Sequence, residues 1–142
     1  MSIRIRNLDL ATAGMKKVTG VSLGDFSGNI DKTIFVAPVD CRIDTVDLYS
    51  GQGVSGTSQS AQITVYVRDA AANSSVLQSR GTSATGGTTN DIVANTQYRL
   101  TPSSIYDLTQ GTVIEMNFSG SGALSAVFVQ TTYTQLLHKN TR

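Results

Sequence analysis

The sequence predicts an all-β fold, an antiparallel β-sandwich of two sheets with a jelly-roll-like arrangement of about seven or eight strands. Charged residues are only 15% and hydrophobic residues 39% of the 142 residues. Ser, Thr, Gly, Asn and Gln fill the difference, and this favours strands and polar loops over helices. Short runs alternate between apolar and polar residues, and turn-rich loops separate them. No ten-residue window follows the 3.6-residue period of an amphipathic helix.

The first 31 residues are expected to form an extended N-terminal arm, and residues 32–142 the β-sandwich domain. The arm begins with alternating isoleucine and arginine, and residues 11–31 then carry isolated apolar residues among Gly, Ser and Thr. Such a segment can wrap its own domain or pair with the sheet of a neighbouring subunit. We therefore expect that removal of residues 2–29 leaves the β-sandwich folded.

Two strands are expected at the start of the sandwich domain. Residues 32–39 form a short apolar run, and Pro38, which lacks a backbone donor, should end that strand or place it at an edge. Residues 42–50 form the next run, in which the apolar phase slips between Ile43 and Val46. A slip of this kind predicts a β-bulge or a change of sheet.

Three further strands are expected in the middle of the chain. Residues 62–68, QITVYVR, show the most regular alternation. Residues 75–80 and residues 91–100 predict two more strands. The polar stretches 51–60 and 81–90 predict long exposed loops.

Residues 112–134 are the most strand-like stretch, with two β-rich runs flanking a turn of small residues, SGSG. We predict that they form a long antiparallel hairpin. Ile114, Met116 and Phe118 share one face of the first run. The second run is apolar on both faces, with Val127, Val129, Thr131 and Tyr133 on one and Leu124, Ala126 and Phe128 on the other. One face should meet the strand at 62–68, and the other should be covered by the arm or by another subunit.

Composition argues against several classes of function. A net charge of +1 gives no strong field to attract nucleic acid or an anionic membrane. No run approaches the roughly 20 apolar residues of a membrane span, and the N-terminus has no apolar core of signal-peptide length. We expect synthesis in a cytoplasm.

No catalytic or metal-binding constellation is apparent, so we expect no enzyme activity, no cofactor and no metal site. His138 is the only histidine and lies in a short tail that we expect to be frayed. Cys41, the only cysteine, is expected to be a buried inert thiol. Glu115 is the only glutamate, and nothing in the sequence pairs it with Asp107, its nearest acidic neighbour along the chain.

Asp40, Asp44 and Asp47 form the densest acidic group. Asp44 and Asp47 point to opposite faces of a regular strand, and their spacing is not that of a calcium loop, so a solvated edge is the better interpretation. A platform for sugar stacking could come from the tyrosines, which are Tyr49, Tyr66, Tyr98, Tyr106 and Tyr133.

Three runs carry a resemblance to a known family: TIFVAPVDCRIDTVDLY at 33–49, QITVYVR at 62–68, and LTQGTVIEMNFSGSGALSAVFVQTTY at 108–133. In layout the chain resembles small β-sandwich structural proteins of tailed bacteriophages, especially head decoration, or cement, proteins. Those proteins show an apolar strand ending before a proline, and a late small-residue turn before a valine-rich strand.

The resemblance implies a non-enzymatic virion protein on the capsid surface, a homotrimer that binds the major capsid protein lattice and stabilises the head. The alternative is a receptor- or glycan-binding module of a phage tail or fibre, which would use Tyr66 and the loops at 51–60 and 81–90. For the decoration role, the candidate contacts to the capsid or to another subunit are Ile3, Arg4, Ile5, Arg6, Lys16 and Lys17.

Overall fold

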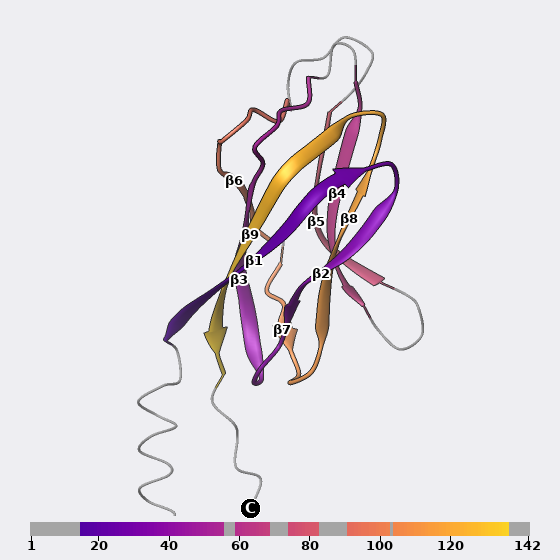
Figure 1. Ribbon diagram of the computed structural model, residues 1–142. Coiled ribbons are helices and arrows are strands. Elements are labelled where there is room, and N and C mark those ends of the chain that lie inside the picture. The colour runs from indigo at the N-terminus through magenta and orange to yellow at the C-terminus, as the bar shows by residue number, and fades with distance from the viewer. Residues whose placement is uncertain (1–14, 56–58, 69–73, 83–90, 103, 137–142) are drawn as a thin grey trace, which may run out of the picture.

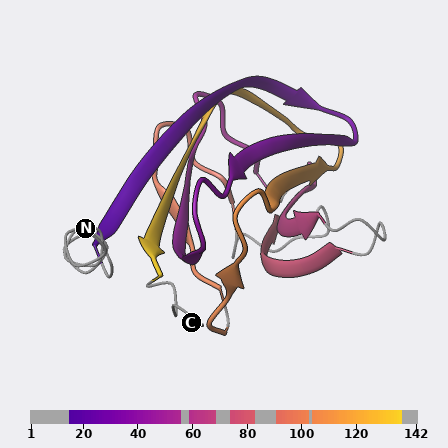
Figure 2. The same cartoon turned by 90° about the horizontal axis from the view of Figure 1, so that it is seen from below.

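A computed structural model describes residues 15–55, 59–68, 74–82, 91–102 and 104–136. These residues form nine strands, which are β1 (Lys16–Ser27), β2 (Ile30–Val36), β3 (Cys41–Tyr49), β4 (Ala61–Arg68), β5 (Ser74–Thr82), β6 (Tyr98–Leu100), β7 (Asp107–Leu108), β8 (Val113–Ser119) and β9 (Ala123–Gln135). The strands build two antiparallel sheets that pack face to face (Figure 1), and Figure 2 shows the two layers from below. The predicted all-β sandwich is confirmed.

The strand order makes the sandwich a jelly roll. The five-stranded sheet has the order β1-β9-β3-β6, with the short β7 also paired to β3, and the four-stranded sheet has the order β2-β8-β4-β5. The chain passes to the other sheet at almost every turn, so strands distant in sequence become neighbours, as two nested Greek keys require. The inner faces of both sheets contribute to one apolar core.

Residues 16–31, expected as the second half of an arm, instead form β1 and the start of β2. β1 pairs with β9 along its length, and its register shifts around Gly24, where the backbone has a φ of 72°. Val21 and Leu23 pack against the core before this bulge and Phe26 is fully buried after it, which explains why their spacing suits no regular strand. Residues 1–14 lie outside the described residues.

The predicted hairpin at 112–134 is wrong in its pairing. β8 pairs with β2 and β4 in one sheet, whereas β9 pairs with β1 and β3 in the other. The SGSG turn therefore crosses between the sheets. Gly120 has a φ of 140°, and a Cβ at this position would lie 2.3 Å from the carbonyl oxygen of Ser60. The amide of Gly122 donates to that same oxygen over 2.9 Å, so the turn is held against Ser60.

The described residues of this chain leave the outer face of β9 partly open, so its expected cover by the start of the arm or by another subunit stays a prediction. Ala126 has a φ of 48°, and this left-handed residue shifts the alternation so that Leu124 and Val127 both point into the core. Ala126 and Phe128 are left exposed on the outer face, where the Phe128 side chain is 40% accessible. The other face of β9 contributes to the core shared with β4, as expected.

The remaining strand predictions have mixed outcomes. β2 ends at Val36, two residues before Pro38, and β3 has a register shift between Ile43 and Thr45 where the phase slip predicted a bulge. β4 alternates between buried and partly or fully exposed residues, as expected. Within 91–100 only β6 is a strand, because Asn95 adopts a φ of 57° and turns the chain. Across the described ranges, no helix is long and apolar enough to cross a membrane.

Candidate interaction surfaces

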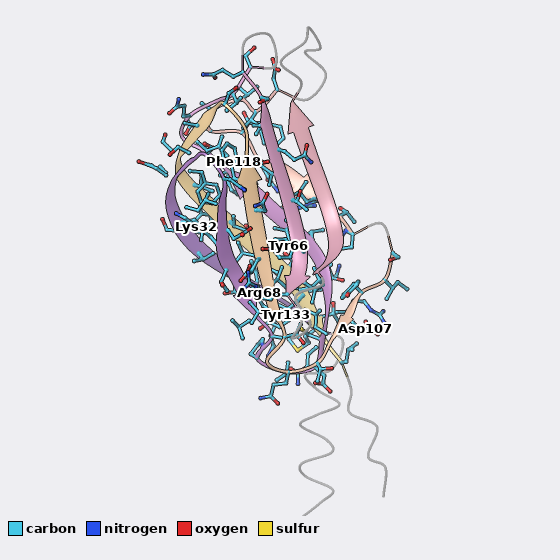
Figure 3. All side chains as sticks on the ribbon, turned by 90° about the vertical axis from the view of Figure 1, so that its right-hand side faces the viewer. Lys32, Tyr66, Arg68, Asp107, Phe118 and Tyr133 are labelled. Carbon is cyan, nitrogen blue, oxygen red and sulfur yellow. The ribbon has the colours of Figure 1, made fainter. Side chains whose placement is uncertain are left out.

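A polar network spans three strands on the outer face of the four-stranded sheet. The Tyr66 hydroxyl on β4 lies 2.7 Å from Oε2 of Glu115 on β8 and 2.9 Å from Oδ1 of Asp31 on β2. Arg68 Nε contacts Oε1 of Glu115 at 2.9 Å, and Asn117 Nδ2 donates to Asp31 over 2.9 Å. Figure 3 shows Tyr66 and Arg68 following each other along β4. The carboxylates of Asp31 and Glu115 thus both contact the hydroxyl group of Tyr66.

The electrostatics of this network keep the Tyr66 hydroxyl protonated, so that it acts as a hydrogen-bond donor. Burial, followed by its hydrogen bonds to Glu115 and Asp31, raises the pKa of the Tyr66 hydroxyl to about 12. The phenol therefore keeps its proton at neutral pH. Glu115 is only 7% exposed and has Arg68 as its cationic partner, so the charge of its carboxylate is compensated inside the network.

The three aspartates of the acidic group lie in β3 or directly before it, and each has a separate partner. Asp47 accepts from Arg99 Nε over 2.8 Å, Asp44 accepts from the Thr134 hydroxyl over 2.7 Å, and Asp40 accepts from the Gln110 amide over 2.8 Å. The prediction of a solvated edge is wrong for Asp47, which is only 3% exposed because the Arg99 side chain lies against it. Hydrogen bonding to Arg99 lowers the pKa of Asp47. In the part of the chain that the structure describes, no three His, Cys, Asp or Glu residues are grouped to hold a metal ion.

Cys41 is completely buried at the start of β3, as predicted. Burial, and then the nearby negative charges of Asp40, Asp107 and Asp44, raise the pKa of its thiol to about 11. The thiol is therefore protonated at neutral pH and is a poor nucleophile. His138 lies outside the described residues.

The first half of β1 forms an exposed sheet edge. β1 is the end strand of its sheet, and residues 16–20 are exposed on both faces, with the Val18 side chain 55% accessible. The predicted contact residues Lys16 and Lys17 lie here, opposite Thr134 and Tyr133 of β9. The other predicted contacts, Ile3, Arg4, Ile5 and Arg6, lie outside the described residues.

An aromatic pair lies on the outer face of the same sheet. The rings of Phe128 and Tyr49, on β9 and β3, are 6.3 Å apart and tilted by 52°. The tip of the Phe128 ring lies over Gly20 of β1, where a Cβ would be 2.5 Å from Cζ. The five tyrosines do not form a common platform, because Tyr133 is buried and Tyr66 belongs to the network on the opposite sheet. The sequence placed Phe128 on the face opposite Val127 and Val129, where it lies, but did not predict its contact with Tyr49, because that contact depends on the pairing of β9 with β3.

No protein-family model and no curated protein sequence matches the chain. Among solved structures, the chain is similar to VP2 in a subviral particle of infectious bursal disease virus, with a TM-score of 0.45 and 14% identity over 87% of this chain and 34% of that chain. A structure of the Gx strain of infectious bursal disease virus has a TM-score of 0.41 and 16% identity over 90% of this chain and 34% of that chain. PirA has a TM-score of 0.38 and 12% identity over 83% of this chain and 92% of that chain.

The match spans about a third of the length of these two viral chains. The jelly-roll assignment rests on the strand order of the two sheets and not on these scores. By its own geometry, the chain is an all-β jelly-roll sandwich with an exposed edge strand and internally paired polar groups.

Proposed function

We propose that the chain is a non-enzymatic structural protein of a bacteriophage virion. In this proposal it is a decoration, or cement, protein that binds the lattice of the major capsid protein on the capsid surface and stabilises the head. The layout of residues 33–133 supports the family, and the exposed first half of β1 supports a role in assembly.

The observation that carries the proposal is the contrast between the two halves of β1. The second half reaches the core through Phe26, which is 0% exposed, whereas residues 16–20 are exposed on both faces. An unpaired strand edge of this kind is a ready template for pairing with another chain. Its position directly after residues 1–14 places the candidate contacts Lys16 and Lys17 beside the segment that contains the others.

The state of the titratable groups favours binding over catalysis. Glu115 is compensated by Arg68 and Asp47 by Arg99, and the Cys41 thiol is protonated at neutral pH. A general acid or nucleophile would need a reactive group directed at a substrate. These side chains are directed at each other or into the core.

The proposal is tested by mixing the purified chain with expanded capsids that lack it, then sedimenting the capsids. We expect the chain to be a homotrimer by analytical ultracentrifugation, to sediment with the capsids and to raise their melting temperature. A variant lacking residues 2–14 retains β1 and Phe26, and should lose capsid binding or trimerisation without losing its β-sheet circular dichroism. A monomer that stays in the supernatant would contradict the proposal.

A receptor- or glycan-binding module remains the second candidate, and the Phe128–Tyr49 pair is the observation that favours it. An aromatic ring exposed on a flat sheet face can stack on the apolar face of a sugar. Phe128→Ala should abolish binding on a glycan array if this function is correct. Capsid binding that is unchanged by Phe128→Ala, together with no glycan binding by the natural chain, would exclude it.

A further inference from the structure

We infer that residues 16–22 of β1 accept an extended strand from a partner protein, and that this strand alternates apolar and acidic residues. The inference rests on the proposed function for the source of the strand, which would be the capsid lattice. The mode of binding follows from the geometry and chemistry of β1.

The backbone of β1 offers a regular acceptor edge. Residues 16–22 pair one to one with residues 134–128 of β9, and the register first shifts after Ser22. In an antiparallel ladder, alternate residues direct their amide and carbonyl groups toward the neighbour, and the residues between them direct theirs away from it. No strand in the described part of the chain pairs with this other edge. The outward-facing groups of residues 16–22 are therefore available for a further strand.

The second half of β1 is closed to such an addition. Its register is broken on both sides of Gly24, and β-bulges of this kind prevent regular pairing. In addition, Lys32 of β2 donates from Nζ to the carbonyl oxygens of Leu23 and Asp25, and its ammonium lies 4.7 Å from the centre of the Phe26 ring. Lys32 is labelled in Figure 3. The open acceptor is therefore confined to the first half of the strand.

The two faces beside the open edge differ in chemistry, and this sets the sequence of the accepted strand. On the outer face, Val18 is 55% exposed, and the tip of the Phe128 ring lies over Gly20, so apolar side chains would pack there. On the inner face, Lys17 lies opposite the core residue Tyr133, and the Lys17 residue itself is exposed to solvent. Acidic side chains at the intervening positions would pair with this ammonium. An alternation of apolar and acidic residues satisfies both faces.

Two other occupants fit less well. If two copies of β1 paired with each other in an antiparallel manner, a twofold axis would relate them and the contact would close as a dimer, which does not build the proposed homotrimer. Residues 3–6 of this chain alternate isoleucine with arginine. Placing those isoleucines beside Val18 would bring the arginines beside Lys17, and like charges across neighbouring strands are unfavourable.

The experiment compares charge changes on one edge strand of each sheet. Val18→Asp on β1 places a carboxylate against the apolar side chains of the accepted strand, and should weaken capsid binding by about tenfold or more. Lys17→Glu, on the inner face, places a carboxylate beside the acidic side chains of that strand and should have an effect of similar size. The matched control is Val36→Asp, because Val36 lies on β2, an edge strand of the other sheet, and is 52% exposed against 55% for Val18. The control should change binding by less than about twofold.

Hydrogen–deuterium exchange provides a direct readout of strand addition. Capsid binding should slow exchange of the amides within residues 16–22 and leave residues 30–36 of β2 unchanged. Binding to capsids without protection of residues 16–22 would overturn the inference while leaving the proposed function intact. Concentration-dependent self-association that Val18→Asp abolishes would also overturn it, in favour of a second copy as the occupant.

A synthetic octapeptide of alternating valine and glutamate separates the inference from the proposed function. It should protect residues 16–22, whereas the valine–lysine octapeptide should not. Protection by the valine–glutamate peptide in a chain that ignores capsids would support the inference and contradict the proposed function. Binding to neither capsids nor this peptide would overturn both.

Discussion

Tyr66 connects three strands through a single hydroxyl group. Its side chain extends from β4 past Glu115 on β8 to Asp31 on β2, and both carboxylates lie within 2.9 Å of its oxygen. Because Glu115 is only 7% exposed, it has little access to water as a substitute donor. The network therefore contributes to stability on a sheet face that would otherwise be fully solvated.

Replacing Tyr66 by Phe should lower the free energy of unfolding by about 1–3 kcal/mol, because a buried acceptor on Glu115 loses its donor. Chemical denaturation at pH 7 measures this change. Tyr49→Phe is the control, since the Tyr49 ring contacts Phe128 on the outer face of the other sheet and would keep that contact. A cost for Tyr66→Phe no larger than that of the control would show that the hydroxyl is solvated in solution.

The same residue predicts a loss of stability at high pH. The pKa of Tyr66 is raised from 10.0 to about 12 in the folded chain. A raised pKa means that the stabilisation is fully present below pH 10 and is lost as the pH rises toward about 12, where a phenolate would face two carboxylates. Denaturation curves from pH 9 to pH 12 should show a steeper loss for the natural chain than for Tyr66→Phe. Parallel curves would contradict this assignment.

Ala126 is the residue whose backbone is least suited to its side chain, with a φ of 48° within β9. Ala126→Gly should raise the free energy of unfolding by about 0.5–1 kcal/mol, because glycine adopts this region without the steric cost of a Cβ. The control Ala123→Gly removes a methyl group at the start of the same strand and should destabilise by about 0.5–1 kcal/mol. Thermal melts of both variants test the opposite signs. Destabilisation by Ala126→Gly would show that this residue is not left-handed in solution.

At the scale of single elements, the regular strands could be predicted from sequence. The alternation at 62–68 is a direct consequence of one buried face, and β4 shows it. The phase slip after Ile43 marked the bulge in β3, because an extra residue must appear in the apolar pattern wherever the strand has one.

Other features of the elements could not be predicted, since they depend on contacts distant in sequence. The SGSG turn suits a hairpin and a crossing between sheets equally well, and only the contact of Gly120 with Ser60 distinguishes them. No sequence pattern predicted a contact between Asp31, Tyr66 and Glu115, because this contact depends on the strand order β2-β8-β4. The basic start of β1 was identified through Lys16 and Lys17, but its place in the sandwich was not.

The crossing between β8 and β9 should be highly sensitive to substitution. Gly120→Ala should lower the free energy of unfolding by at least about 2 kcal/mol, because it adds strain at a φ of 140° to a contact of 2.3 Å with the Ser60 carbonyl. Gly111→Ala is the matched control, since Gly111 has a φ of 87° but nothing within 4 Å of its Cβ position. The control should cost about 1 kcal/mol. Equal losses would show that the turn moves away from Ser60 without cost.

At the scale of the whole molecule, β1 is part of the β-sandwich, although its residues were expected to belong to an arm outside the sandwich domain. It supplies the fully buried Phe26, whose ring lies 5.9 Å from that of Phe118 in the opposite sheet, and it is a sheet neighbour of β9. The expectation that residues 2–29 can be removed without loss of the fold is therefore no longer supported.

Deletion of residues 2–29 should unfold the domain or lower its melting temperature by more than about 10 °C, because a core aromatic side chain and an edge strand are lost together. Deletion of residues 2–14 should change the melting temperature by only a few degrees, since β1 and the core are retained. Circular dichroism melts of both variants distinguish the two cases. A deletion of 2–29 that melts like the natural chain would mean that β1 contributes little to the fold.

The pairing of β1 with β9 also determines when this chain can finish folding. Val21 pairs with Val129, a residue 108 positions later in the sequence. At a synthesis rate of about 5–20 residues per second, β1 leaves the ribosome roughly 5–20 s before its partner exists. During that interval Phe26 has no core to enter, and the closure of so long a loop makes the later pairing slow. β1 is thus among the last strands to be incorporated, and chaperones would find it exposed on nascent chains.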